Sequence, residues 1–210
     1  MAVGLKLNKT KRMTRTDIIN LLAKHNNASS YLEVGVRDTE ENFNKIICEL
    51  KHGVDPALGP GSYTQGMGYQ TYSDIYFEYI NKDVLYDIIL IDGLHTEEQV
   101  DKDIKNSLDR LTPSGVIVLH DCSPPNEEFE QPHWCGTVWR SLYKLHRDTT
   151  DLEICVVDTD YGCGIVRKGD KVRMNVSDPE ELSYAFLDNN RKEVLNLISI
   201  TEFIQKIIND

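Results

Sequence analysis

The amino-acid sequence predicts an α/β fold, a Rossmann-like doubly wound sheet that is mostly parallel and carries helices on both of its faces. Residues 88–91 and 116–119 are continuously apolar, whereas a strand with one wet face would alternate, so both runs belong in strands covered on two sides. Such runs alternate along the chain with segments of helical spacing, as in strand–helix–strand units. A length of 210 residues suits a single domain of this kind.

The first half of the chain opens with a helix, because Ile18, Leu21 and Leu22 recur at helical spacing directly after Thr16-Asp17. Glycine and proline mark the boundaries of the next elements along the chain. The remaining elements expected in this half are a strand at 31–36, a helix over 40–50, a short strand ending at 54–56, a glycine-rich loop at 59–68 and a helix capped by Ser73-Asp74.

The second half begins with the central strand at 86–92, whose carboxyl end carries Asp92. Thr96 and Gln99 fit a capping box, and Val100 and Ile104 continue at helical spacing, so a long helix comes next. The later elements expected are a buried strand at 116–119 ending at His120-Asp121, a proline-rich loop, a helix over 137–146, strands at 153–157 and 164–167, and helical structure after residue 178.

The chain divides into a basic N-terminal arm at 1–15, an α/β domain at 16–170 and a C-terminal helical extension at 171–210. The arm is expected to be solvated, and its cations are Lys6, Lys9, Lys11, Arg12 and Arg15. The extension is expected to pack on the domain or on a dimer mate. Its apolar side is formed by Val194, Leu197, Ile198, Ile204 and Ile208.

Composition narrows the class of ligand and the compartment. With 23 basic and 34 acidic side chains the net charge is −11, which argues against nucleic acid as a partner and favours a small molecule. The longest aliphatic runs have four residues, too few for a membrane span, and no apolar stretch behind the basic arm resembles a secretory signal. Five cysteines without a CxxC pair indicate a reducing, cytoplasmic location.

Residues at the carboxyl ends of the predicted strands are the first candidates for functional residues, because ligands of open α/β sheets lie beyond these ends. Gly35 lets the backbone approach a ligand, and Asp55 comes 22 residues after Glu33, near the spacing of ribose-binding carboxylates in nucleotide folds. Arg37 and Glu40 stand where a dinucleotide motif requires glycine. An adenosine-containing cofactor is therefore expected, and a dinucleotide is disfavoured.

A second group of polar residues lies after two strands predicted to be neighbours: Asp92 and His95 after one, His120 and Asp121 after the other. Adjacent parallel strands are about 5 Å apart, so these side chains could share one divalent cation. Two carboxylates suit magnesium, and the imidazole of His120 shifts the preference toward manganese or another later metal.

Three other interpretations of this region remain open. His120, Cys122, His133 and Cys135 could bind zinc, although their spacing lacks the usual CxxC knuckle. Cys122 or Cys135 could act as a nucleophile, but Asp121 next to Cys122 would raise a thiol pKa. Trp134 and Trp139 either pack in the core or line a substrate pocket.

Four motifs together resemble the class I S-adenosylmethionine-dependent methyltransferases, and more narrowly the metal-dependent O-methyltransferases that modify sugars and macrolides. They are Tyr31-Leu32-Glu33-Val34-Gly35, Val54-Asp55-Pro56, Ile91-Asp92-Gly93-Leu94-His95-Thr96 and Val118-Leu119-His120-Asp121-Cys122. The resemblance covers roughly residues 28–168, which makes 16–170 the methyltransferase domain.

The resemblance implies roles for the strand-end residues. Glu33 and Gly35 would approach the methionine part of the cofactor, and Asp55 would hold the ribose hydroxyls. Asp92 would end the fourth strand, with His95 as general base, and Asp92, His120 and Asp121 would hold Mg or Mn. Ser73, Asp74 and Asp92 complete the predicted cofactor site. His120 departs from the family, whose members usually carry an acidic residue there.

The sequence thus predicts an S-adenosylmethionine-dependent O-methyltransferase that acts on a hydroxyl of a sugar, free or nucleotide-linked, or of another small polar molecule. Trp134, Trp139 and Tyr161 would stack on the sugar, and the loops at 59–68 and 122–135 are candidate lids. The alternatives are an NAD- or nucleotide-sugar-dependent Rossmann enzyme and a non-catalytic binding module that docks through the apolar side of the extension. No nucleic acid and no membrane span are expected, and a homodimer is possible.

Overall fold

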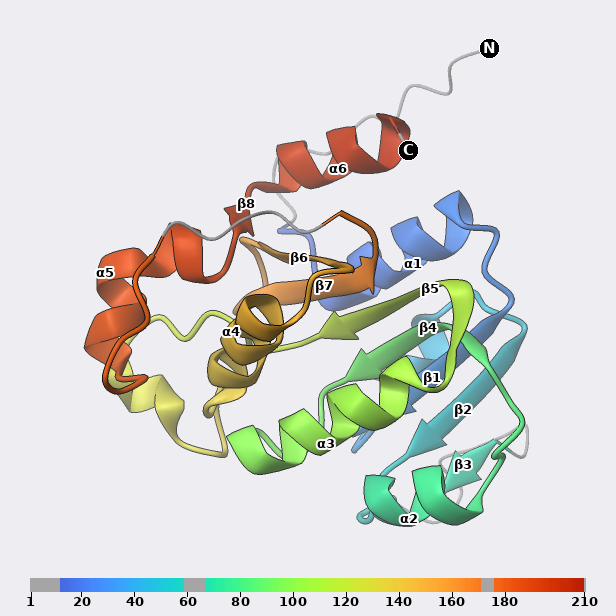
Figure 1. Cartoon of the computed structure of the whole chain (residues 1–210). Helices are drawn as coiled ribbons and strands as arrows, with labels where there is room; N and C mark the ends of the chain where they lie inside the picture. Colours follow the sequence, from blue (N-terminus) through green and yellow to red (C-terminus); the bar gives the residue numbers. More distant parts are fainter. Residues whose placement is uncertain (1–11, 59–66, 171–175, 210) are drawn as a thin grey trace.

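The computed structural model describes residues 12–58, 67–170 and 176–209. These residues form an eight-stranded sheet in the order β3-β2-β1-β4-β5-β7-β6-β8 (Figure 1). Its strands are β1 (Ser30–Val34), β2 (Leu50–Val54), β3 (Gly68–Tyr69), β4 (Tyr86–Ile91), β5 (Leu111–Leu119), β6 (Leu152–Val157), β7 (Cys163–Lys168) and β8 (Leu197–Ile198). Every neighbouring pair is parallel except those of β7, which runs antiparallel to β5 and β6. The predicted mostly parallel, Rossmann-like sheet is confirmed.

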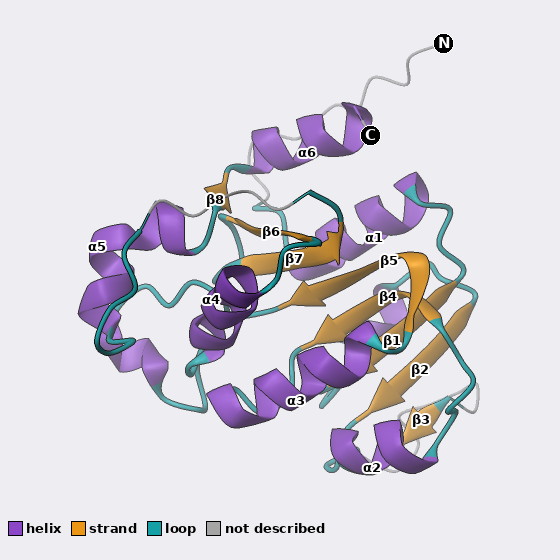
Figure 2. Cartoon of the chain, viewed as in Figure 1, coloured by secondary structure: helices purple, strands orange, loops and turns teal. Residues whose placement is uncertain are grey.

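Helices cover both faces of the sheet, as Figure 2 shows. One face is covered by α2 (Ser73–Tyr79), α3 (Glu97–Leu108), α4 (Val138–Asp148) and α5 (Tyr184–Val194), and the other by α1 (Arg15–His25) and α6 (Ile200–Asn209). Short 3-10 turns lie at Phe43–Lys45 and Glu127–Glu130.

The burial of β4 on both of its faces explains why apolar and polar residues do not alternate in its sequence. Ile89 and Ile91 point into the core beneath α2, α3 and α4, while Ile88 and Leu90 point into the core beneath α1 and α6. All four are at most 3% exposed. Each such side chain contributes about 1.5–3 kcal/mol through burial, so both faces of the strand select apolar residues.

The position of β1 creates the opening in which a ligand can lie. β1 pairs with β2 on one side and with β4 on the other, so the chain leaves β1 toward one half of the sheet and returns to the other half. The carboxyl ends of β1 and β4 therefore flank a crevice that no connection crosses, which is the usual binding position in open α/β sheets.

The helix predicted over 40–50 is wrong. Only the 3-10 turn Phe43–Lys45 forms there, and β2 already begins at Leu50. Asn42 is 1% exposed and turns its side chain toward Glu33, and the backbone N–H of Asn44 donates to the carbonyl of Thr39. Asparagine side chains that find such local and tertiary partners compete with helix formation.

Two helix starts differ from the prediction in detail. Helix α1 begins at Arg15, with Thr14 and Asp17 forming the capping box, so the last residue of the predicted arm is helical. Thr96 is the N-cap of α3, but no side-chain cap bond forms, and Gln99 turns toward α2 instead.

The C-terminal extension contributes a strand as well as helices. Leu197 and Ile198 pair in parallel with β6, and Val194 is 1% exposed within the core beneath α5. Ile208 on α6 is 73% exposed. Much of the apolar side of the extension, which was predicted to dock on a partner, thus packs against the eight-stranded sheet of this chain. No helix in the described ranges is both long and apolar enough to cross a bilayer.

Candidate active site

A cavity of about 780 Å³ lies at the carboxyl ends of β1, β2 and β4. This volume falls in the range of about 300–1,000 Å³ that is typical of small-molecule sites. The structure brings all the predicted site residues to its lining: Glu33, Gly35, Asp55, Ser73, Asp74, Asp92, His95, His120 and Asp121.

Glu33 is the buried carboxyl of β1 and is 2% exposed. The Tyr31 hydroxyl donates to its Oε2 at 2.7 Å, and Asn42 Nδ2 donates to the same oxygen at 2.9 Å. Thr16 on α1 fixes Asn42 by donating to Asn42 Oδ1 at 2.7 Å. Burial outweighs these bonds and raises the pKa of Glu33 to about 7. No pattern in the sequence indicates that Tyr31 and Asn42 are its partners.

Gly35 is required for a reason that the sequence did not indicate. Its φ is +90°, and a Cβ atom built on it would lie 2.1 Å from the carbonyl oxygen of Asp92. The close approach predicted at Gly35 is therefore a contact with the protein's own backbone, at the end of β4. A side chain at this position would separate β1 from β4 at the floor of the cavity.

Asp55 comes directly after β2, and its carboxylate is held by the loops around it. Its Oδ2 accepts from the backbone N–H of Arg37 at 2.8 Å, and its Oδ1 accepts from the N–H of Ala57 at 2.7 Å. Each oxygen keeps a further lone pair, so the carboxylate can accept two more hydrogen bonds from vicinal hydroxyls in the cavity.

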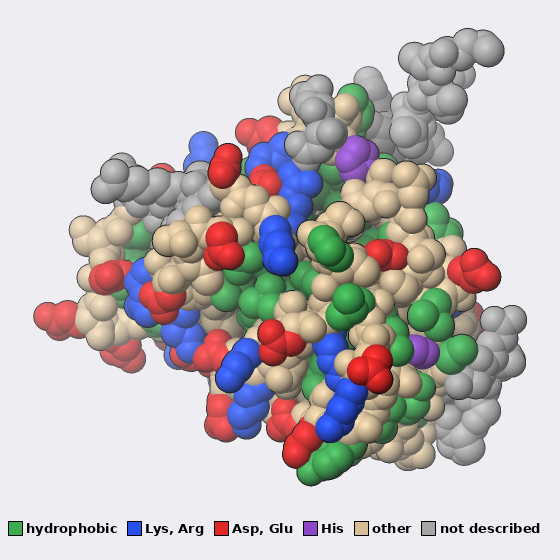
Figure 3. Space-filling view, turned by 45° about the vertical axis from the view of Figure 1, so that its right-hand side comes forward, with side chains coloured by type: hydrophobic (Ala, Val, Ile, Leu, Met, Phe, Trp, Pro, Cys, Tyr) green, Lys and Arg blue, Asp and Glu red, His purple; other side chains and the backbone are tan. Residues whose placement is uncertain are grey.

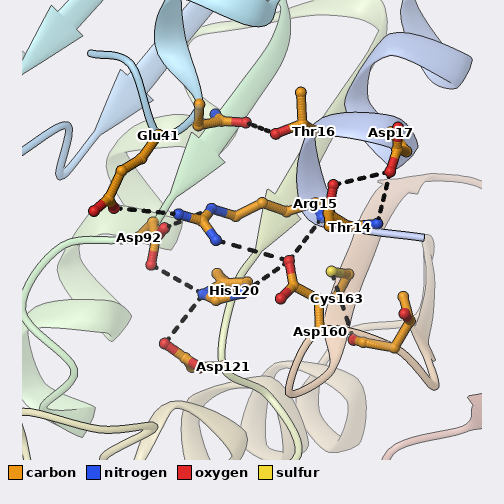
Figure 4. Close-up of polar contacts among 12 residues, drawn as sticks. Thr14, Arg15, Thr16, Asp17, Glu41, Asp92, His120, Asp121, Asp160 and Cys163 are labelled. Atoms are coloured by element: carbon orange, nitrogen blue, oxygen red, sulfur yellow. Dashed lines mark hydrogen bonds and ion pairs between the residues drawn. The ribbon is translucent and has the colours of Figure 1, made fainter. Parts of the chain in front are cut away.

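Asp92 lies beside the guanidinium group of Arg15 and the imidazole of His120 (Figure 4). Arg15 Nε lies 3.1 Å from its Oδ2, and His120 Nδ1 and His95 Nε2 lie 3.2 and 3.4 Å from its Oδ1. Although burial acts in the opposite direction, His120, His95 and Arg15 hold the pKa of Asp92 well below its usual range. Asp92 is therefore an ionised carboxylate.

His95 is oriented by the loop that precedes α4. Its Nδ1 contacts the backbone carbonyl of Trp134, and its own carbonyl accepts from the N–H of Thr137 at 2.9 Å. A Cβ on Gly136, whose φ is +56°, would lie 1.9 Å from that carbonyl. Because a carbonyl only accepts, Nδ1 carries the proton, and the lone pair of a neutral His95 is on Nε2.

His95 also has a raised pKa. Burial lowers it, but the hydrogen bond with Asp92, the charge of Asp121 and the carbonyl of Trp134 together outweigh burial. An imidazole so placed is a stronger base than a free histidine.

Arg15 and Asp160 are functional candidates that the sequence analysis missed. Arg15 was predicted to lie in a solvated arm, which is wrong: its side chain is 20% exposed and reaches Asp92. The backbone N–H of Arg15 donates to Asp160 Oδ2 at 2.8 Å, and His120 Nε2 lies 3.4 Å from the same oxygen. Despite burial, His120 and Arg15 lower the pKa of Asp160 to about 2. No spacing in the sequence signals a contact across 145 positions.

Three residues beside this cluster have left-handed backbone conformations without being glycine. The φ angles of Asp121, Asp160 and Tyr161 are 60°, 49° and 59°. Such conformations cost of order 1–3 kcal/mol and concentrate where function fixes a side chain.

The carboxylates of Asp92 and Asp121 are close enough to share a cation. Together with His95 they offer one ligand atom each, and all three atoms lie within 4.8 Å of one another. His120 Nδ1 approaches the same two carboxylates, at 3.2 Å from Asp92 Oδ1 and 3.1 Å from Asp121 Oδ2. The donor set of two oxygens and imidazole nitrogen suits a divalent ion such as Mn²⁺.

The zinc and cysteine interpretations are not supported by the structure. Cys122 belongs to the core, where its Sγ lies 3.5 Å from the carbonyl of Leu119, apart from the cavity that His120, His133 and Cys135 line. Burial raises the thiol pKa of both Cys122 and Cys135 far above the usual range, so neither is a poised nucleophile.

Aromatic side chains form one wall of the cavity near His95. Phe129 packs against Trp134 with ring centroids 5.0 Å apart and stacks on Tyr161 at 5.7 Å. Trp134 and Tyr161 are 49% and 43% exposed, so their faces are available. Trp139 is fully buried and donates Nε1–H to Glu130 at 2.7 Å, so its predicted place at the mouth is wrong.

Charge in the cavity is strongly unbalanced. Seven carboxyl side chains line it, against the two guanidinium groups of Arg15 and Arg37. The outer face in Figure 3 differs, because acidic and basic side chains are interspersed there with hydrophobic ones. The cavity therefore favours a ligand that carries positive charge.

Several solved structures with the same fold are described as methyltransferases. An O-methyltransferase from Bacillus cereus in complex with SAH has a TM-score of 0.58 at 12% identity and aligns over 76% of this chain and 84% of its own. A putative caffeoyl-CoA O-methyltransferase from Staphylococcus aureus has a TM-score of 0.56 at 17% identity, over 77% and 87%. The O-methyltransferase TomG from Streptomyces achromogenes, in complex with SAM, has a TM-score of 0.54 at 13% identity, over 72% and 78%.

At these identities the likeness concerns the fold, which is that of the class I methyltransferases. A family model described as a methyltransferase domain also matches residues 22–122, a segment that contains every predicted site residue. No curated protein matches the chain. Residues 22–122 match the methyltransferase domain, which together with the shared fold indicates an S-adenosylmethionine-dependent methyltransferase rather than an NAD enzyme or a non-catalytic module.

The residues present fit S-adenosylmethionine. The cavity has room for it, the carboxylate of Asp55 is oriented to accept ribose hydroxyls, and the excess of carboxyl groups complements a ligand with a sulfonium and an ammonium group.

Proposed function

We propose that the protein is an O-methyltransferase that methylates a hydroxyl of a sugar or of another small polar molecule. The observation that carries this proposal is the orientation of His95, whose Nδ1 is held by the Trp134 carbonyl and whose Nε2 faces Asp92 in the cavity. A hydroxyl needs a base of this kind, since its own pKa is far above 7.

The cofactor supplies an electrophilic methyl group on its sulfonium. Asp55 would accept hydrogen bonds from the ribose hydroxyls, and the Glu33 carboxylate would pair with the ammonium group. These contacts would hold the methyl donor beside Asp92 and His95. Holding oxygen, carbon and sulfur in line contributes up to roughly 7–11 kcal/mol when the alignment is good.

His95 Nε2 would accept the proton of the acceptor hydroxyl as the new carbon–oxygen bond forms and the carbon–sulfur bond of the donor breaks, with S-adenosylhomocysteine as the leaving group. Asp92 and Asp121, with His120 as a third ligand, would hold a divalent cation that stabilises the developing alkoxide. The positions of the donor atoms support this assignment: His120 Nδ1 lies 3.2 Å from Asp92 Oδ1 and 3.1 Å from Asp121 Oδ2.

The acceptor is expected to be neutral and to present a flat apolar face. Trp134 and Tyr161 offer exposed aromatic faces beside His95, as sugar rings require. The excess of carboxyl groups in the cavity disfavours a phosphate-bearing acceptor, so a free sugar is favoured over a nucleotide-linked one. The cytoplasmic location and the homodimer stay predictions from the sequence.

A labelled methyl donor tests the proposed reaction. Hydroxyl, amine and carboxylate acceptors are compared with the wild type, His95→Ala and the matched control His133→Ala, which removes an exposed imidazole from the same cavity. We expect methylation of hydroxyls and a rate lower by about 10²–10⁴-fold in His95→Ala alone. Methylation of amines or carboxylates only, or an unchanged rate in His95→Ala, contradicts the proposal.

Metal dependence is tested separately by dialysis against EDTA and by Asp92→Asn. We expect turnover to fall in both and to return on adding Mn²⁺ or Mg²⁺ to the dialysed wild type. Full activity after dialysis would show that the cation is not needed, while leaving the methyl transfer to oxygen intact.

A further inference from the structure

Residues 121–125 connect the candidate active site to helix α5 of the C-terminal extension. This segment follows β5, and the yellow-green trace in Figure 1 runs from the end of β5 toward α5. Asp121 at its start lines the cavity. Helix α5 lies outside the region that matches the methyltransferase domain. The contacts between the segment and α5 thus involve a part of the chain that the proposed chemistry at His95 does not use.

Arg191 is the side chain of α5 that makes most of these contacts. Its Nη1 donates to Ser123 Oγ and to the carbonyl of Pro124, both at 2.9 Å. Its Nη2 donates at 3.0 Å to the hydroxyl of Tyr184, and this hydroxyl donates to the carbonyl of Pro125 at 3.0 Å. One guanidinium group therefore holds three consecutive residues of the segment, two directly and one through Tyr184.

The turn after β6 holds the backbone of the same segment. The N–H of Ser123 donates to the carbonyl of Tyr161 at 2.7 Å, and the N–H of Cys122 donates to the carbonyl of Gly162 at 3.0 Å. A Cβ atom on Gly162 would lie 2.6 Å from Ser123, so the turn and the segment are in close backbone contact. The turn thus fixes the start of the segment, and α5 fixes the side chain of Ser123 and the two proline carbonyls.

Asp121 depends on this support because its backbone conformation is unfavourable. Its φ is +60°, a left-handed value that residues other than glycine keep only where the surrounding structure fixes them. Its Oδ2 lies 3.1 Å from His120 Nδ1 and 3.6 Å from His95 Nδ1. Without the contacts of Arg191, the backbone at Asp121 can relax, and its carboxylate then moves away from these imidazoles.

We propose that Arg191 is a positioning residue, which keeps the Asp121 carboxylate in the active site by holding Ser123 and Pro124. Arg191 does not line the cavity, so it acts through the segment and not on cofactor or acceptor. The effect on cation binding rests on the proposed role of Asp121 as a ligand, whereas the effect on the segment itself does not. The C-terminal extension then serves the active site as well as covering the sheet.

The first measurement compares two affinities of the full chain by calorimetry, for Mn²⁺ alone and for S-adenosylhomocysteine. We expect Arg191→Met to weaken Mn²⁺ roughly 10–100-fold, as the loss of groups that orient a metal ligand does. The affinity for S-adenosylhomocysteine should stay the same, because Glu33 and Asp55 lie on β1 and directly after β2. Arg191→Lys keeps a cationic donor and should recover part of the Mn²⁺ affinity. The matched control Lys192→Met, an exposed neighbour on α5, should equal the wild type.

The second measurement is the rate at which N-ethylmaleimide alkylates each thiol, followed by peptide mapping. Cys122 belongs to the segment and is fully buried, whereas Cys48 is a buried thiol elsewhere in the fold. Arg191→Met should speed the alkylation of Cys122 roughly 10-fold or more, because losing hydrogen bonds from a charged donor favours local opening. Alkylation of Cys48 should not change, which distinguishes local opening from general unfolding.

An unchanged Mn²⁺ affinity in folded Arg191→Met, or equal losses for Mn²⁺ and S-adenosylhomocysteine, overturns the positioning role. If the wild type binds no Mn²⁺, the proposed cation site is wrong, and the alkylation of Cys122 decides the role of Arg191: a faster rate supports it and an unchanged rate overturns it. If Arg191→Met does not fold, Tyr184→Phe is the second variant. It removes the contact with Pro125 and should change both measurements in the same direction by less; no change in either overturns the proposal.

Discussion

Replacing Glu33 with glutamine should stabilise the protein at neutral and alkaline pH while weakening cofactor binding. The pKa of Glu33 is raised from 4.5 to about 7, chiefly by burial. The folded wild type therefore binds a proton more tightly than the unfolded chain, and its stability falls as the pH rises between these two values. At about 1.4 kcal/mol per pKa unit, the full loss above pH 7 is roughly 3 kcal/mol.

Glutamine has no proton to lose, and its oxygen can still accept from Tyr31 and Asn42. Urea denaturation of both proteins from pH 4 to 8.5, without cofactor, measures the difference. We expect similar stability below pH 4.5 and an advantage of Glu33→Gln that grows to about 3 kcal/mol near pH 7 and then levels off. The control Glu41→Gln removes a carboxyl whose side chain is 44% exposed in the same cavity, so no comparable advantage is expected. Parallel pH curves for wild type and Glu33→Gln would refute the reasoning.

Three further changes test other parts of the site. Asp55→Asn should weaken S-adenosylhomocysteine about 10-fold or more in calorimetry, because one ribose hydroxyl loses its charged acceptor, and an unchanged affinity would reject the ribose role. Gly35→Ala should lower the free energy of unfolding by at least about 3 kcal/mol in urea, because its Cβ would overlap the Asp92 carbonyl; near-wild-type stability would contradict that geometry. Trp134→Ala keeps the backbone carbonyl that orients His95, so it should raise the KM of the acceptor roughly 10-fold with little change in kcat. An equal loss in kcat would argue against a stacking role.

The sequence was informative for residues whose position is set by the strand that directly precedes them. Continuous apolar runs identified β4 and β5 as central strands, and polar residues directly after them had to meet at one edge of a parallel sheet. Asp92, His95, His120 and Asp121 could therefore be placed together from the sequence, and the structure brings them into one cavity. Local spacing and strand direction are enough for this kind of prediction.

The sequence was not informative where a residue acts through tertiary contacts. Asn42 lies in a segment with an acceptable helical pattern, and only its buried contacts with Tyr31 and Glu33 explain why no long helix forms. Gln99 fits a capping box by type and spacing, but the acceptors of α2 and Asp103 take its side-chain hydrogens instead. Such outcomes depend on partners that no periodicity specifies.

The contact between the start of α1 and the turn after β6 has a consequence for how the protein folds during synthesis. Arg15 and Asp160 are separated by 145 positions, and Thr159 bonds to the carbonyl of Met13 across 146. All the predicted cofactor residues lie before residue 122, whereas Asp160 and the aromatic wall of Phe129, Trp134 and Tyr161 come later. A chain emerging N-terminus first thus completes the residues of its cofactor pocket well before those of its acceptor side. Arg15 can pair with Asp160 only after 145 further residues have been added to the growing chain.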